Sequence, residues 1–143
     1  MKNSVVVLKK QIQEILKTPS TKGVRLVEPF KSFALKNKLP FKILEDNNIV
    51  NAPEIHAKEG DLWYCLEGEC TFKHGGKLIK TEYRKNDQGN DDKNELVGHK
   101  IKGGQKCILR PGDWLWIPPH VPHQHLTKTI ARLLIIKIPI NQP

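Results

Sequence analysis

The sequence lacks long apolar runs, paired cysteines and internal repeats. It has no stretch of eighteen apolar residues, and the run Val5–Leu8 is too short for the apolar region of a signal peptide. The cysteines, Cys65, Cys70 and Cys107, form no Cys-x-x-Cys pair, and their odd number argues against a secreted disulfide framework. We therefore expect a soluble cytoplasmic protein with no membrane partner.

Acidic and aromatic residues are also scarce. Asp and Glu number 15 against 24 Lys and Arg, which gives a formal net charge of +9, and aromatic residues make up 6% of the chain. The lysines are scattered from Lys2 to Lys137 rather than clustered with aromatic residues, so no nucleic-acid partner is expected. A small-molecule substrate or ligand is expected instead, and the positive field is compatible with an anionic one.

The chain is rich in turn residues and short β-type runs. Its 143 residues suit one domain, 1–143. Apolar residues at three- and four-residue steps predict a helix over 4–17, in an N-terminal segment 1–18. Residues 41–139 are predicted to form a small barrel, with a surface loop over the charged residues 84–99. The predicted strands are Val24–Val27, Phe41–Leu44, Leu62–Leu66, Cys70–Lys73, Lys77–Tyr83, Lys106–Leu109, Trp114–Ile117, Gln124–Thr127 and Arg132–Ile138, with a turn at 46–48. The expected fold class is mainly β, a barrel or double-sheet jelly roll.

Two short segments each carry part of a metal-ligand set. The first offers His56 and Asp61, with Glu54 two residues before the histidine, and the second offers His123. Side chains alternate along a strand, so Glu54 and His56 point to one face, and a turn at 59–60 lets Asp61 rejoin it. Two imidazoles with one or two carboxylates suit a first-row transition metal.

The spacing within these segments resembles the two motifs of the cupin superfamily. The matching residues are His56, Asp61 and Gly68 in the first motif, and Gly112, Pro118 and His123 in the second. The departures are Asn48 and His120 where the family has Gly, Glu54 in place of its first His, Asp61 in place of Glu, and Thr127 in place of Asn. The resemblance implies a double-stranded β-helix, the cupin jelly-roll barrel, with a short N-terminal helix and one bound metal ion.

The resemblance also implies roles for the residues in these segments. His56, Asp61 and His123 are expected to bind one divalent metal, with Glu54 as a fourth ligand or as a catalytic acid–base. Fe(II) is the first choice, because two His and one carboxylate with open positions suit oxygen chemistry, and Mn, Zn and Ni are the other candidates. The expected substrate-pocket residues are Trp63 and Cys65, by the two-residue period from Asp61, and His125, which shares the face of His123.

A narrower similarity links His56–Gly68 and Pro118–His123 to 3-hydroxyanthranilate dioxygenases. It implies a dioxygenase acting on a small polar molecule, although Ala52 and Thr127 stand near the places of that family's substrate-clamping arginines. The alternatives are a metal-dependent isomerase or lyase, a non-catalytic ligand-binding cupin, and a barrel that has lost its metal. The apolar run Leu133–Ile136 is consistent with burial on both faces, and a homodimer is expected.

Overall fold

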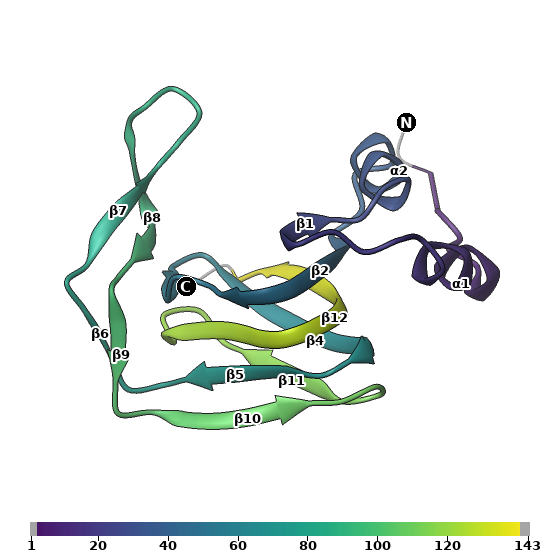
Figure 1. Ribbon diagram of the computed structural model, residues 1–143. Coiled ribbons are helices and arrows are strands. Elements are labelled where there is room, and N and C mark those ends of the chain that lie inside the picture. Colours follow the sequence, from purple (N-terminus) through teal and green to yellow (C-terminus); the bar gives the residue numbers. More distant parts are fainter. Residues whose placement is uncertain (1–2, 141–143) are drawn as a thin grey trace.

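A single long strand organises the β-barrel. The computed structural model describes residues 3–140, and β12 (His123–Pro139) runs through the barrel as its central strand (Figure 1). One edge of β12 pairs with β2 (Phe41–Val50), and the other pairs first with β5 (Cys70–His74) and then with β4 (Glu59–Gly68). The register with β2 shifts between Thr127 and Ile130, and such a bulge bends a strand. One bent strand thereby joins both layers of the barrel.

Shorter strands complete the barrel, and all the pairings are antiparallel. β10 (Gln105–Leu109) pairs with β5, and β11 (Trp114–Ile117) pairs with β4. β1 (Gly23–Leu26) pairs with β2, and β3 (Glu54–His56) pairs with the first residue of β12.

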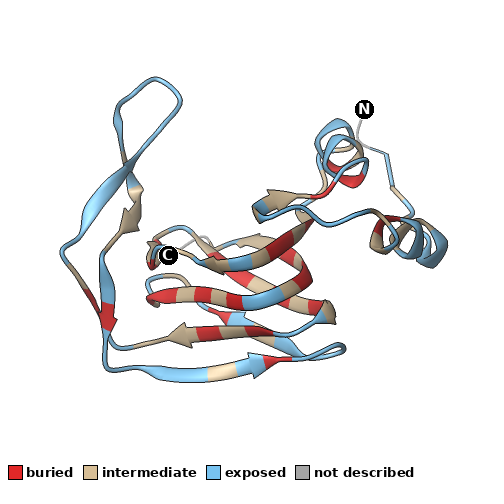
Figure 2. Ribbon diagram, viewed as in Figure 1, coloured by how far each residue is buried: buried red, intermediate tan, exposed pale blue. Residues whose placement is uncertain are grey.

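A two-part arm projects from the barrel (Figure 1). Its strands are β6 (Lys77–Ile79) with β9 (Lys100–Lys102), and β7 (Glu82–Lys85) with β8 (Asp91–Val97). Figure 2 shows that much of the arm is exposed. β8 also pairs with β3, so the arm is attached beside two of the expected site residues.

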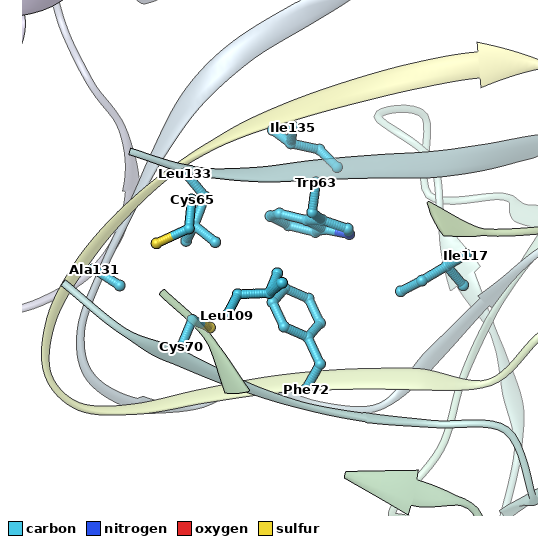
Figure 3. Packing of buried hydrophobic residues seen from close by; sticks show 9 residues of the cluster. All are labelled: Trp63, Cys65, Cys70, Phe72, Leu109, Ile117, Ala131, Leu133 and Ile135. Atoms are coloured by element: carbon cyan, nitrogen blue, oxygen red, sulfur yellow. The ribbon is translucent and has the colours of Figure 1, made fainter. Parts of the chain in front are cut away.

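The barrel interior is filled by alternating apolar side chains of five strands (Figure 3). Because side chains alternate along a strand, every second residue of each contributing segment reaches this core. Its buried members are Trp63, Cys65, Cys70, Phe72, Leu109, Ile117, Ala131, Leu133 and Ile135.

Two helices form a second, smaller core at one end of the barrel. α1 (Lys9–Leu16) and α2 (Phe30–Lys36) contribute Ile15, Phe30 and Ala34, which pack with Val27 and Ile43. No helix within residues 3–140 is long and apolar enough to cross a membrane.

A buried arginine fastens α1 to the barrel. Arg132 donates hydrogen bonds to the backbone carbonyls of Leu16 at 2.7 Å and Thr18 at 2.6 Å, which satisfies acceptors at the helix end. Its Nε also donates to the buried Glu45 carboxylate at 2.7 Å, and Arg25 binds the same carboxylate from β1.

The predicted mainly β class is confirmed, and a cupin jelly-roll barrel is consistent with the structure.

Several predicted elements were wrong. Residues 84–99 are not a loop: they continue β7, turn at 86–90 and return as β8. The Asn86 side chain accepts from the backbone N–H groups of Gln88 and Asn90, so the polar residues build a hairpin turn. Residues 46–48 belong to β2 rather than to a turn, and α1 begins at Lys9 rather than at residue 4.

Two strand boundaries were also wrong. The predicted strand Lys77–Tyr83 is divided, because Lys80 adopts a left-handed backbone with φ of 55°. The predicted strands 124–127 and 132–138 are one strand, because β2 continues to pair with β12 across the bulge.

Candidate metal centre

Three strands bring the expected ligands together at one end of the barrel. Glu54 and His56 lie on β3, Asp61 on β4, and His123 opens β12 directly opposite Glu54 in the antiparallel register. The backbone N–H of His120 donates to the carbonyl of His56 at 2.8 Å, which fixes the second motif against the first. Two segments far apart in sequence therefore supply one cluster.

Within the cluster, both imidazoles face both carboxylates through their Nε2 atoms. Oδ2 of Asp61 lies 3.3 Å from Nε2 of His56 and 3.4 Å from Nε2 of His123. Oε1 of Glu54 lies 3.6 Å from each of the same two nitrogens. Ligand atoms that share an ion with bonds of about 2.0–2.2 Å are separated by similar distances.

Each imidazole is oriented by a partner on its outer side. Nδ1 of His56 contacts the Glu95 carboxylate of β8, and Nδ1 of His123 lies 2.9 Å from the carbonyl oxygen of Val121. Both acceptors favour a proton on Nδ1, so that a neutral ring directs its Nε2 lone pair into the cluster. Metal-binding histidines almost always have such a carboxylate or carbonyl partner on the other nitrogen.

Each carboxylate is held on its outer side in the same way. Lys137 of β12 donates to Oδ1 of Asp61 at 2.7 Å, while Arg84 of β7 donates to Oε2 of Glu54 at 2.7 Å. The Lys137 ammonium also lies 3.3 Å from Nε2 of His56. These outer contacts leave Oδ2 of Asp61 and Oε1 of Glu54 facing the imidazoles.

The inner atoms include buried polar groups without hydrogen-bond partners. Oδ2 of Asp61 and Nε2 of His123 are both buried and unpaired, and such groups cost free energy unless an ion or water binds them. Ligand atoms of Glu54, His56 and His123 all lie within 4.8 Å of one another, with Asp61 beside both imidazoles. These residues could hold a metal ion, and the unpaired buried atoms fit that assignment.

The charges of the cluster are strongly coupled. Burial by itself would favour neutral groups, but the contacts of His123 with Asp61, Glu54 and the Val121 carbonyl raise its pKa to about 9. Burial also opposes ionisation of Glu54, but His123, His56 and Arg84 lower its pKa to about 2. The pKa of Asp61 lies well below its usual range because the two imidazoles and Lys137 outweigh burial. The carboxylates therefore remain anionic at neutral pH, as metal ligands must.

A cavity of about 350 Å³ adjoins the cluster. Of the expected pocket residues, Trp63 and His125 line it, and so does Glu54. Cys65 lies instead in the barrel core, where burial raises the pKa of its thiol to about 11. The two-residue period correctly put Cys65 on the strand face of Trp63, but Cys65 packs within the core and does not line the cavity.

Sequence reasoning missed the outer partners of the cluster. Arg84 and Glu95 fall in the charged segment that was predicted to be a loop. Had this segment been predicted to be a strand, the alternation of side chains along β8 could have indicated that Glu95 faces His56. Lys137 lies on a long strand whose register follows only from its pairing with β4, where it stands opposite Asp61.

Two residues that depart from the cupin pattern keep the positive φ angle that is typical of the glycines in that pattern. Asn48 and His120 stand where the pattern has Gly, and both have positive φ, 52° and 68°. Gly68 and Gly112, which match the pattern, also have positive φ, 73° and 94°. This backbone region is open mainly to Gly and is tolerated by Asn and His better than by most residues.

Solved structures support this interpretation at the level of fold. YcfD of E. coli superposes with a TM-score of 0.57 and 19% identity, over 83% of this chain and 34% of that chain. The Drosophila melanogaster CENP-C cupin domain superposes with a TM-score of 0.50 and 9% identity, over 80% of this chain and 67% of that one. The chain has a cupin fold.

A further solved structure superposes less well on this chain. A putative ethanolamine utilization protein Q from Salmonella typhimurium LT2 gives a TM-score of 0.46 at 16% identity, over 75% of this chain. This chain spans 64% of that protein's chain and about a third of YcfD. No protein-family model matches the sequence, and the search of curated proteins found no match.

Proposed function

We propose that this cupin is a metal-dependent enzyme of the dioxygenase type that acts on a small molecule. The observation that carries the proposal is the shared arrangement of His56, Asp61, His123 and Glu54. Each has one polar atom fixed by an outer partner and a second polar atom directed at the same point. Two His with a carboxylate, next to a cavity, form the donor set typical of non-haem Fe(II) oxygenases.

The residues around the centre have separable roles. His56, His123 and Asp61 would hold the metal, which when bound would bind and activate oxygen or polarise a substrate oxygen. Oε1 of Glu54 lies near both imidazoles, and Glu54 also lines the cavity. We therefore propose that Glu54 could contact both the metal and the substrate. Arg84 keeps the Glu54 carboxylate turned toward the centre, and Glu95 does the same for the His56 ring.

Loading the metal-free protein with Fe(II) without oxygen tests this proposal before any substrate is known. Nitric oxide serves as a spectroscopic substitute for oxygen, and the electron paramagnetic resonance signal of its iron adduct reports an iron with an open position. We expect this signal in the parent and in His99→Ala, whose imidazole is exposed on the arm, and its loss in His123→Ala. An iron-loaded parent without the signal would contradict the dioxygenase assignment.

The competing assignment is a cupin that binds its ligand without catalysis. Lys137 already places a cation beside Asp61 and His56, so charge balance in the cluster does not by itself require a metal. Oxygen consumption by the iron-loaded protein with small organic acids, measured beside His123→Ala, separates the two assignments. Turnover that needs His123 supports the enzyme, and stoichiometric ligand binding without turnover supports the binding module.

A further inference from the structure

Positive charge is concentrated in two segments of the chain, residues 70–81 and 98–110. Together they contain seven Lys and Arg residues and no Asp or Glu, so they hold +7 of the formal net charge of +9. The rest of the chain is close to neutral, and the positive field of the protein therefore originates mainly from these two segments. Their basic residues are Lys73, Lys77, Lys80, Lys100, Lys102, Lys106 and Arg110.

Strand pairing joins the two segments into one structure, which we call the basic ribbon. Residues 70–81 contain β5 and β6, residues 98–110 contain β9 and β10, and β5 pairs with β10 while β6 pairs with β9 (Figure 1). Lysines that are scattered along the sequence thereby become neighbours. The expectation of no nucleic-acid partner rested on their positions in the sequence, which pairing changes.

Two lysine pairs stand directly across the basic ribbon from each other. Lys73 is opposite Lys106 in β5–β10, and Lys77 is opposite Lys102 in β6–β9. Like charges directly opposite each other on paired strands destabilise a sheet. The fold therefore carries an electrostatic cost that a bound polyanion would relieve.

Acidic side chains do not neutralise this charge. Of the seven basic residues, only Arg110 forms an ion pair with another side chain within residues 3–140, at 3.5 Å from Glu69. Lys73 donates instead to the backbone carbonyl of Ile101 at 2.8 Å, a contact that ties β5 to β9 and leaves the charge in place.

The pair β6–β9 presents its lysines on one face. Because side chains alternate along a strand, Lys77, Lys100 and Lys102 share a face, while Leu78 and Ile101 occupy the opposite one. Leu78 and Ile101 are buried, and the three lysines are exposed. A large anion laid on this face can contact all three ammonium groups.

The bend between β5–β10 and β6–β9 is tightly packed (Figure 1). Gly76 and Gly104 lie there with φ of 69° and 80°, a backbone region that favours glycine. A Cβ at Gly76 would lie 2.4 Å from the carbonyl oxygen of Lys102, and one at Gly104 would lie 2.7 Å from that of His74. Close backbone contact fixes the lysine pairs on the two sides of the bend before any partner binds, which lowers the cost of ordering them.

The shape of the basic ribbon favours double-stranded DNA among polyanions. A two-stranded β-ribbon fits the major groove of B-DNA, where lysines on it reach the phosphates. Proteins that bind single strands add aromatic side chains on which the bases stack. The one aromatic residue of the two segments is Phe72, which is buried in the barrel core.

A membrane surface fits the basic ribbon less well. Binding to lipid headgroups usually combines basic residues with exposed Trp, Phe or Leu that enter the acyl boundary. Leu78 and Leu109 of the ribbon are buried. The exposed Trp114 and Trp116 lie on β11, which pairs with β4 and not with the ribbon.

We propose that the basic ribbon binds double-stranded DNA through its phosphates, without preference for sequence. Lysine acts on phosphate as a point charge, whereas sequence is read mainly by side chains that contact base edges in the grooves. The inference goes beyond the proposed function and does not depend on it, because no residue of the basic ribbon belongs to the candidate metal centre or lines its cavity.

Fluorescence anisotropy of a labelled duplex of about 25 base pairs, titrated with the whole chain at several salt concentrations, tests the proposal. The three lysines of the β6–β9 face predict a slope of log K against log salt of about −2.7 or steeper, at about −0.9 for each phosphate contact. Equal affinity is expected for a duplex of unrelated sequence. No duplex binding at about 50 mM salt, or a slope near zero, would overturn the proposal.

Two matched triple variants locate the site. Lys77→Gln/Lys100→Gln/Lys102→Gln removes the charges of the β6–β9 face and is expected to weaken duplex binding at least tenfold at about 100 mM salt. The control removes the same charge from exposed lysines of the two helices, and it is expected to change the affinity by less than about twofold. An equal loss in both variants would overturn the assignment to the ribbon. The control is Lys9→Gln/Lys31→Gln/Lys36→Gln.

Lys102→Glu separates binding from folding. It places an acid directly opposite Lys77, so it replaces a repulsive cross-strand pair with an attractive one. We expect a higher melting temperature than that of the parent together with weaker duplex binding. A raised melting temperature with unchanged duplex affinity would overturn the role of this face.

Two further probes distinguish the classes of polyanion. A single-stranded oligonucleotide of the same length, and vesicles of phosphatidylserine and phosphatidylcholine, are both expected to bind more weakly than the duplex. Tighter binding to the single strand, or vesicle binding without duplex binding, would overturn the assignment to double-stranded DNA.

Discussion

Nε2 of His123 lies 3.4 Å from Oδ2 of Asp61, and neither of these buried atoms has a hydrogen-bond partner. The outer atoms of the same side chains are both hydrogen-bonded, to the Val121 carbonyl and to Lys137. The surrounding strands therefore fix the two groups as an ion pair that is longer than a good hydrogen bond, with the pKa of His123 raised to about 9 by its contacts with Asp61 and Glu54. A metal ion that replaces the His123 proton would fit between these atoms, and the predictions below follow from that arrangement.

The outer carboxylate of His56 should tune metal binding without supporting the fold. Glu95→Gln replaces the carboxylate that orients the His56 ring with an uncharged group of the same size. We expect metal affinity to fall by about 10–100-fold, the usual effect of losing such a partner, with little change in the free energy of unfolding. Competition with a chromophoric chelator measures the affinity. Glu82→Gln, on the exposed face of β7, is the matched control, and an equal loss in both variants would contradict the assignment.

The stability of the metal-free protein should decrease from neutral to alkaline pH. The pKa of His123 is about 9 in the folded protein and about 6.5 in an unfolded chain, so the folded state binds the proton more tightly. The stabilisation is complete below pH 6.5 and is lost as the pH rises through about 9, and we expect roughly 1–3 kcal/mol. Urea unfolding at pH 6.5 and 9 measures it.

His123→Gln removes the titrating group and should flatten this pH dependence. A metal-free protein that is as stable at pH 9 as at pH 6.5 would contradict the charge coupling described for the cluster. Metal binding should show the opposite trend, with affinity increasing with pH, because the metal requires the deprotonated ring.

Much of the cluster was predictable because the spacing within each motif is a local property. Strand alternation and tight turns act over a few residues, so the sequence could indicate that Glu54, His56 and Asp61 share a face. That His123 lies beside them was expected from the resemblance to the cupin motifs, and the structure brings these residues together. The outer partners were not predictable in this way. Lys137 meets Asp61 only because β12 pairs with β4 in one register, and a register between distant strands is set by the packing of the whole barrel.

Charged composition was the most misleading signal. Residues 84–99 have the composition of a solvated loop, yet they form a hairpin in which Glu95 reaches back to His56. Pairing with β3 and β7 on its two sides outweighs the low β-propensity of Asp and Asn in β8.

The glycine-like backbone at Asn48 gives a test of the fold assignment. Asn48 is exposed and has a φ of 52°, a region that costs a β-branched residue more than it costs Asn and that Gly adopts freely. We expect Asn48→Gly to be neutral or to stabilise by up to about 1 kcal/mol, and Asn48→Val to destabilise by about 1–2 kcal/mol. Thermal unfolding of both variants checks this, and the reverse order would contradict the left-handed backbone.

Arg132 should contribute strongly to the attachment of α1. Arg132→Met keeps much of the apolar stem but leaves the helix-end carbonyls and part of the buried Glu45 carboxylate without a partner. We expect a loss of about 3 kcal/mol, typical of breaking a buried ion pair. Urea unfolding beside Lys128→Met, an exposed residue on the same strand, measures it. A loss below that of Lys128→Met would show that α1 is held by its apolar contacts alone.

The metal content of the purified protein tests the central claim most directly. Elemental mass spectrometry is applied to the parent and to the His56→Ala/His123→Ala double variant, each after loading with Fe(II), Mn or Zn and removal of excess ions. The arrangement of the four side chains predicts about one equivalent in the parent and none in the variant. A parent that retains none of the three metals, or a double variant that retains as much as the parent, would contradict the metal centre.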